Sequence, residues 1–114
     1  MTYRFDPQDT HVVIRLAGDV MGGPDFEPFL QRVEGLLARG HRSFVLDLSG
    51  ARWINSTGLG ILVTVFRRVQ DAHGALAVCG ANKRIRGIYY VAQLEKVFRA
   101  YDTVGEGVAA VTAA

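Results

Sequence analysis

The segment that most constrains the fold is Ser43–Leu48, an almost continuous apolar run that lies between turn signals. A strand of this composition is typical of the centre of a sheet that is covered on both faces. Residues 75–79 (Ala-Leu-Ala-Val-Cys) have the same character. A helical pattern lies between the two runs. Strands that alternate with helices predict a mixed sheet with helices packed against it.

Hydrophobic periodicity predicts the other elements. Apolar residues spaced by three and four after Gly22-Gly23-Pro24 predict a helix with Asp25 as its N-cap, Pro28 at its third position and Gly40 as its end. In chain order we expect strands at Tyr3–Asp6 (an edge) and His11–Leu16, this helix, the strand at Ser43–Leu48, a helix at Thr57–His73, the strand at 75–79, a helix at Lys83–Ala92 capped by Asn82, a strand at Val97–Ala100 and a helix at Val108–Ala114. The predicted fold class is α/β, a small mixed sheet flanked by about four helices in the order β-β-α-β-α-β-α-β-α.

Length and composition narrow the class of protein. A chain of 114 residues is expected to form one domain, residues 1–114, around a single core. With 49% apolar and 21% charged residues it is not intrinsically disordered, and no apolar run approaches the roughly 18 residues of a membrane span. The N-terminus lacks the pattern of a secretory signal, and the single cysteine, Cys79, fits a reducing cytosol, so we expect a cytoplasmic protein. The formal charge of +2 is too small to indicate nucleic-acid binding, and the basic cluster at Lys83, Arg84 and Arg86 is typical of a solvated helix face.

The stretch 47–62 carries the strongest functional signal. The apolar strand is expected to end there in a loop that turns through Ser49-Gly50. The next helix begins near Ser56, whose hydroxyl is expected to act as an N-cap by accepting from the free N–H groups of the first turn. Gly58 and Gly60 each cost about 1 kcal/mol of helix propensity relative to alanine. Two glycines so close together indicate the close approach of another backbone, or of a partner that must reach the serine.

The run Leu46-Asp47-Leu48-Ser49-Gly50, followed by Ile54-Asn55-Ser56-Thr57-Gly58-Leu59-Gly60, resembles the STAS domain, and more specifically the bacterial anti-anti-sigma factors (anti-sigma factor antagonists). The signature of that family is Asp-Ser-(Ser/Thr)-Gly-Leu-Gly. The resemblance implies a small sheet flanked by helices, and a partner that is an anti-sigma factor, usually a serine kinase that binds ATP. It also implies that the kinase phosphorylates Ser56, that phosphorylation ends binding, and that a phosphatase restores it. A protein of this kind sequesters the anti-sigma factor and so frees a sigma factor, which makes it a phosphoprotein of signal transduction and transcription regulation by partner switching.

Two positions depart from the family pattern. Asn55 stands where the family usually has Asp, which removes repulsion toward a phosphate but also removes an acceptor for a kinase or a partner. Ala92-Gln93-Leu94 replaces a common Ser/Thr-Gly-Leu turn, so the loop there is expected to differ. Thr57 is a second hydroxyl beside Ser56 and a candidate minor phosphorylation site.

The predicted partner surface combines the start of the 57–73 helix with the loop after the second strand. A helical projection places one apolar group on the core side: Leu59, Leu62, Val63, Phe66 and Val69. Ile61 falls roughly opposite, so it is the candidate apolar contact for a partner, with an ordinary isolated surface residue as the alternative. The loop around Gly22-Gly23 is expected to lie beside the Ser56 turn at one end of the sheet. The predicted partner-binding residues are Asp19, Met21, Asn55, Ser56, Thr57, Gly58, Gly60, Ile61, Thr64 and Arg68.

Two other roles remain open at this point: a STAS scaffold in a stress-signalling assembly, or the STAS subunit of a lipid-transport ATPase, neither of which requires phosphorylation. An enzyme is not expected, because the spacing brings no pair of carboxylates, Cys/His pair or Ser/His/Asp set together, and Gly18–Gly23 lacks the lysine of a phosphate-binding P-loop. The histidines are scattered singly, without metal-ligand spacing. We therefore expect no cofactor, no metal, no direct contact with nucleic acid, no membrane insertion, and a monomer in the absence of the partner.

Overall fold

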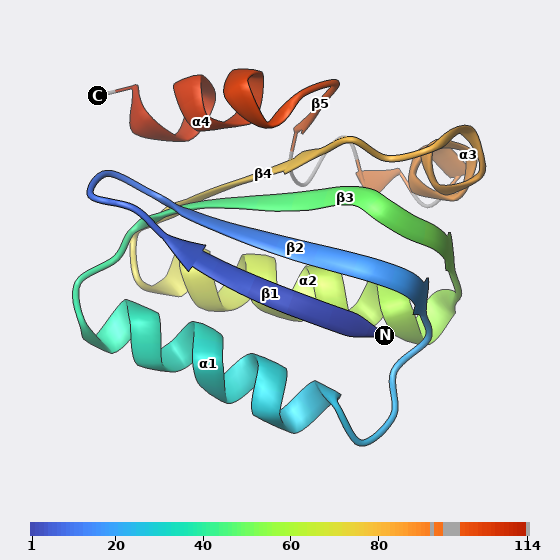
Figure 1. The fold of residues 1–114 in the computed structure, drawn as a ribbon, viewed down its shortest axis with the longest axis horizontal. Coiled ribbons are helices and arrows are strands. Elements are labelled where there is room, and N and C mark those ends of the chain that lie inside the picture. Colours follow the sequence, from blue (N-terminus) through green and yellow to red (C-terminus); the bar gives the residue numbers. More distant parts are fainter. Residues whose placement is uncertain (92, 95–98, 114) are drawn as a thin grey trace.

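The computed structural model describes residues 1–91, 93–94 and 99–113. Within these residues the strands are β1 (Thr2–Pro7), β2 (Val12–Val20), β3 (Ser43–Ile54), β4 (Ala75–Cys79) and β5 (Ala100–Tyr101), and the helices are α1 (Phe26–Ala38), α2 (Ser56–Asp71), α3 (Lys83–Val91) and α4 (Val104–Thr112). The strands form one sheet in the order β1-β2-β3-β4-β5. β1 is antiparallel to β2, and the remaining neighbours are parallel (Figure 1). The predicted α/β class, with a mixed sheet and four helices, is confirmed.

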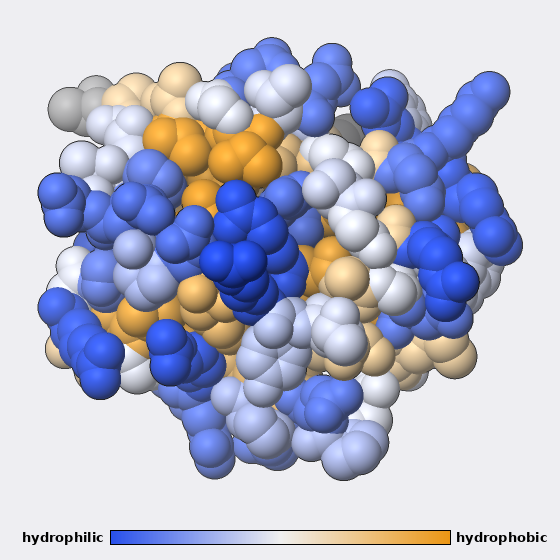
Figure 2. All heavy atoms as spheres, in the orientation of Figure 1, coloured by the Kyte–Doolittle hydropathy of each residue, from blue (hydrophilic) through white to orange (hydrophobic). Residues whose placement is uncertain are grey.

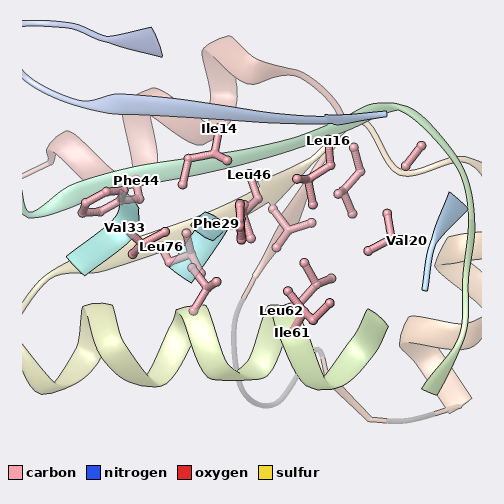
Figure 3. Close-up of a cluster of buried hydrophobic side chains, with 14 of the residues drawn as sticks. Ile14, Leu16, Val20, Phe29, Val33, Phe44, Leu46, Ile61, Leu62 and Leu76 are labelled. Atoms are coloured by element: carbon pink, nitrogen blue, oxygen red, sulfur yellow. The ribbon is translucent and has the colours of Figure 1, made fainter. Parts of the chain in front are cut away.

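Helices cover both faces of the sheet. α1 and α2 lie side by side on one face, and α4 lies on the other, over β3 and β4 (Figure 1). Along β3, Phe44 and Leu46 belong to the large core beneath α1 and α2, whereas Val45 packs with residues of β4 and α4. Figure 3 shows part of the large core, between α2 and the strands of the sheet. This two-sided burial explains why Ser43–Leu48 is almost continuously apolar.

β3 is longer than predicted, because it does not end at Leu48. It continues through Ser49-Gly50 to Ile54, paired with β2 and shifted in register at two points. Gly50 is not a turn residue: a Cβ atom there would lie 3.2 Å from the Cβ of Ala17 on β2. The glycine therefore marks a close approach between two strands, a meaning that glycine has inside strands as well as in turns. The added length carries the end of β3 to the start of α2.

Several other predicted bounds shift. β2 extends to Val20, and α4 begins at Val104, four residues before the predicted start, because the Thr103 Oγ1 accepts from the Glu106 backbone N–H at 3.1 Å. Residues 103–106 have the Thr-x-x-Glu pattern of such a capping pair, which predicts this start of α4. The predicted strand at Val97–Ala100 lies partly outside the described residues, as does Ala92, and β5 is found at Ala100–Tyr101. The predicted cap of α3 is confirmed, since the Asn82 Oδ1 accepts from the Ile85 N–H at 2.9 Å.

The prediction that Ile61 is exposed is wrong. Its side chain is 2% exposed, and it points with Leu62 from α2 toward the sheet (Figure 3). Val65 and Val69 complete the buried face of α2, whereas Leu59, Val63 and Phe66 are only half-buried. The apolar residues of α2 span a wide arc, so a helical projection does not show which part of the arc faces the sheet. In the structure the first turn of α2 lies on β2, and the side of the helix with Ile61 faces the sheet.

The surface seen in the orientation of Figure 1 is mostly polar, with apolar residues in small separate patches (Figure 2). Among the residues that the structure describes, none of the helices combines the length and the apolar character that crossing a bilayer requires.

Candidate functional site

The site is built where the end of β2 meets the start of α2. The backbone N–H of Asn55 donates to the Val20 carbonyl at 3.3 Å. A Cβ atom on Gly58 would lie 1.9 Å from the same carbonyl oxygen and 2.7 Å from the Cγ1 of Ile54. Gly58 is therefore a glycine because the first turn of α2 lies directly on the β2 backbone. For Gly58, this confirms one of the two reasons that the sequence suggested, the close approach of another backbone.

The loop after β2 also packs against this turn. Gly22 has a φ of +84°, in the left-handed region that favours glycine, and a Cβ atom there would lie 2.6 Å from the Cγ2 of Thr57. At the end of β2, Asp19 forms an exposed ion pair with Arg52 of β3, with 3.7 Å between Oδ1 and the guanidinium Nη2. Met21 is 47% exposed. The loop after the second strand thus lies beside the Ser56 turn, as predicted.

The N-cap of α2 is Asn55 and not Ser56, which corrects the sequence prediction. Asn55 has extended backbone angles, and its Oδ1 accepts from the Gly58 N–H at 2.8 Å. Ser56 is the first residue of the helix and is exposed. Within the described part of the chain its hydroxyl makes no hydrogen bond. The division of roles matters chemically, because the serine hydroxyl is free to react without loss of the cap.

The exposed side of α2 runs from Ser56 past Gly60. A Cβ atom on Gly60 would meet nothing within 4 Å, so no contact among the described residues explains this glycine. Thr64 is half-buried, and its hydroxyl donates to the Gly60 carbonyl at 2.8 Å. Arg68 is held in an ion pair with Glu34 of α1. Of the predicted partner residues, Gly60 and Thr64 remain on the Ser56 side, Arg68 is tied to α1, and Ile61 is in the core.

A groove between α2 and α3 was missed by the sequence analysis. It has a volume of about 600 Å³ and is lined by Trp53, Leu59, Lys83, Arg84, Gly87, Ile88 and Val91. The Arg84 guanidinium lies 4.5 Å from the centre of the Trp53 ring, in a cation–π contact. The sequence alone indicates Trp53 as a core or helix-rim aromatic and Arg84 as part of a solvated face. Only the tertiary structure brings the two side chains together.

A polar cluster on the face of the sheet that α4 partly covers consists of Asp47, Arg15 and Cys79. The carboxylate of Asp47 is buried, accepts from the Ser49 N–H at 3.0 Å and lies 3.6 Å from the Nε of Arg15. Burial, and next the charge of Asp47, raise the pKa of Cys79 to about 12. The thiol is therefore protonated and unreactive at neutral pH. Among the described residues no group of three or more His, Cys, Asp or Glu side chains could hold a metal ion.

Known proteins resemble this chain both in sequence and in fold. The model of the STAS domain family matches residues 4–107. A protein of Thermotoga neapolitana, named as a candidate anti-sigma factor antagonist, is 29% identical over 70 residues, which make up 61% of this chain and 62% of the relative. The matched stretch thus spans less than two thirds of that relative's length.

Solved structures share the fold over nearly the whole chain. A candidate anti-sigma factor antagonist of Thermotoga maritima has a TM-score of 0.84 at 21% identity, with 96% of this chain and 93% of that chain covered. The anti-sigma factor antagonist SpoIIAA of Bacillus has been solved in an unphosphorylated and a phosphorylated form. The two forms have TM-scores of 0.72 and 0.74 at 16% identity, and cover 92% and 96% of this chain, and 92% and 99% of their own. At these identities the likeness concerns the fold.

Proposed function

This chain belongs to the STAS domain family, and from that premise we propose that it is an anti-sigma factor antagonist switched by phosphorylation of Ser56. In this proposal the unmodified chain sequesters an anti-sigma factor that is also a serine kinase with its own ATP, and thereby frees a sigma factor. The kinase then phosphorylates Ser56 and no longer binds the modified chain. A phosphatase restores the unmodified form. The chain itself performs no catalysis.

The observation that carries the proposal is the position of Ser56. Its side chain is exposed at the first residue of α2, makes no hydrogen bond within the described part of the chain, and leaves the capping role to Asn55. A kinase can therefore reach the hydroxyl without opening the fold. Two comparisons also support the proposal. A relative from Thermotoga neapolitana is named as a candidate anti-sigma factor antagonist, and the structural neighbour SpoIIAA has been solved in a phosphorylated form.

The physics of the switch follows from the helix terminus. Phosphorylation adds about −1.5 to −2 charges at pH 7. The first amides of a helix have no partner inside the helix, and its positive dipole end favours an anion. The Asn55 side chain already satisfies the Gly58 N–H, so the amides of Ser56 and Thr57 are those available to a phosphate. The modified chain is thus expected to stay folded.

The effect of the phosphate then falls on the partner. A surface that fits a small hydroxyl beside Gly60 must instead accept a bulky dianion, which costs both steric fit and charge complementarity. Gly60 supports this view, because the described contacts give no structural reason for a glycine at an exposed helix position. The loop with Met21 borders the same surface and is proposed as part of it.

Asn55 fits the proposed role in spite of the departure from the family pattern. It keeps the hydrogen bond that an aspartate cap would make, since the Oδ1 accepts from the Gly58 N–H. It lacks the negative charge that would oppose a phosphate on the next residue. We therefore propose that the neutral cap preserves the helix start and leaves Ser56 open to phosphorylation.

The proposal is tested with the purified chain, the serine-kinase anti-sigma factor of the same organism, and ATP. Trypsin cleaves after Arg52 and Arg67, so Ser56 and Thr57 lie on one peptide, whose fragmentation assigns the phosphate. We expect phosphate on Ser56, none in Ser56→Ala, and undiminished transfer in the control Thr57→Ala. Unchanged incorporation in Ser56→Ala would place the site elsewhere.

Binding gives the second readout. Ser56→Ala is expected to bind the kinase whether or not ATP is present, whereas Ser56→Asp is expected to bind weakly with an unchanged far-UV circular dichroism spectrum. Tight binding by Ser56→Asp would contradict the mechanism in which charge blocks the partner.

A further inference from the structure

The groove between α2 and α3 has an apolar floor and a basic rim. Trp53, Leu59 and Ile88 are half-buried along it, and Val91 at its far end is 86% exposed. A mid-helix glycine, Gly87, also lines it, and a Cβ atom there would meet nothing within 4 Å. Glycine inside a helix costs about 0.5–1 kcal/mol relative to alanine. As at Gly60, the described residues contain no contact that explains this cost.

Among the residues that the structure describes, the rim of the groove carries an excess of positive charge. The sequence of α3, Lys-Arg-Ile-Arg-Gly-Ile-Tyr-Tyr-Val, contains three basic residues and no acidic one. Arg86 is paired with Asp102, but within the described part of the chain neither Lys83 nor Arg84 forms an ion pair. Both stand in the first turn of α3, where the helix dipole disfavours positive charge. An anionic group brought by a partner would relieve this arrangement.

The groove also continues the proposed partner surface. Leu59 lies three residues after Ser56, close to one turn along α2, and it forms part of the groove wall. The wall of the groove thus begins about one helical turn from Ser56.

From these features we infer that the groove receives an acidic amphipathic segment of the anti-sigma factor. Its apolar side chains lie against Trp53, Leu59 and Ile88, and its carboxylates pair with Lys83 and Arg84. This inference rests on the proposed function and adds the chemistry by which one anti-sigma factor is chosen over others. Burial of apolar side chains provides affinity, and the two cations select a segment of opposite charge. The Trp53 ring holds Arg84 at the rim in advance, which reduces the entropy lost on binding.

The first test measures the binding of the purified kinase anti-sigma factor to the full chain in the Ser56→Ala background, so that phosphorylation does not intervene. Reversal of both rim charges (Lys83→Glu with Arg84→Glu) is expected to weaken binding by about tenfold or more in 50 mM salt, and by less in 500 mM salt. The control Arg39→Glu reverses one exposed charge at the far end of α1, half the charge change of the rim variant, and is expected to stay within about twofold. Equal affinity of the rim variant and its parent would overturn the inference.

The second test fills the groove. Gly87→Leu places an isobutyl group where the structure has open space, and it is expected to reduce affinity without loss of thermal stability. Gly35→Leu is the matched control, because Gly35 is an exposed glycine inside α1 with equally open space around it. Normal binding by Gly87→Leu would show that the groove stays empty in the complex.

The outcomes separate the two proposals. If the parent binds and Ser56→Asp does not, but the rim and groove variants bind like the parent, then the inference fails while the proposed function stands. If the parent itself does not bind the kinase anti-sigma factor, both fail together.

Discussion

Replacement of Gly58 by alanine is the sharpest test of how α2 is held on the sheet. The new Cβ would lie 1.9 Å from the Val20 carbonyl oxygen, a distance that no real contact allows. The neighbour is backbone, so no side chain can rotate away. The start of α2 must move off β2, and the Asn55 N–H bond to the Val20 carbonyl is weakened or lost.

The magnitude follows from three contributions. Overpacking costs about 1–3 kcal/mol, and loss of one hydrogen bond adds about 1 kcal/mol. Alanine returns about 1 kcal/mol of helix propensity. The net expectation is a loss of about 1–3 kcal/mol, or roughly 4–12 °C in melting temperature for a chain of this size.

Gly60→Ala provides the matched control on the same helix. It gains the same helix propensity but meets nothing within 4 Å, so it is expected to stabilise the chain by about 0.5–1 kcal/mol. The assay is urea denaturation followed by far-UV circular dichroism, with the midpoint and slope compared across the wild type and both variants. Opposite signs are expected. A Gly58→Ala variant as stable as Gly60→Ala would show that the first turn of α2 does not rest on the β2 backbone.

Three further predictions concern stability and are checked by the same denaturation assay. Asn55→Ala is expected to cost about 1 kcal/mol through loss of the cap, whereas Asn55→Asp keeps the acceptor and should equal or slightly exceed the wild type; an unchanged Asn55→Ala would refute the cap. Ile61→Ala is expected to lower the free energy of unfolding by about 2–5 kcal/mol because the side chain is buried, whereas Gln70→Ala, at an exposed position, should change it by less than about 0.5 kcal/mol. A small effect of Ile61→Ala would contradict the burial of Ile61. The pKa of Cys79 is about 12 in the folded chain and 9.0 ordinarily. Between these pH values the unfolded chain binds fewer protons than the folded chain, so the free energy of unfolding falls as the pH rises from about 9. Cys79→Ala should lack this part of the pH dependence, and identical profiles for the two proteins would contradict the shift.

The comparison of sequence and structure is most instructive at β3. The apolar run Ser43–Leu48 predicted a central strand correctly, because burial on both faces leaves a mark on every residue. The extension through Ser49-Gly50 was missed, because glycine and serine are also typical of turns. These residues form a strand because they pair with the backbone of β2. β2 is distant in the sequence, so the residues around Ser49-Gly50 do not reveal that pairing.

The site shows the same division. The motif predicted a serine at the start of a helix, and Ser56 is the exposed first residue of α2, while its phosphorylation stays a prediction. Its role as cap was assigned one residue too late, because Asn and Ser are both good N-caps and only the backbone angles distinguish them. The position of Ile61 was wrong because α2 is apolar over a wide arc, and the groove was missed because its walls come from β3, α2 and α3.

The chain alone thus determined the strand and helix order, the two-sided burial of the central strands and the serine at the start of a helix, since each leaves a local pattern in residue type and spacing. The tertiary structure alone decided the rotation of α2, the reason for Gly58 and the meeting of Arg84 with Trp53. These depend on contacts between segments far apart along the chain, and such contacts acquire a direction and a distance only when the segments are packed together.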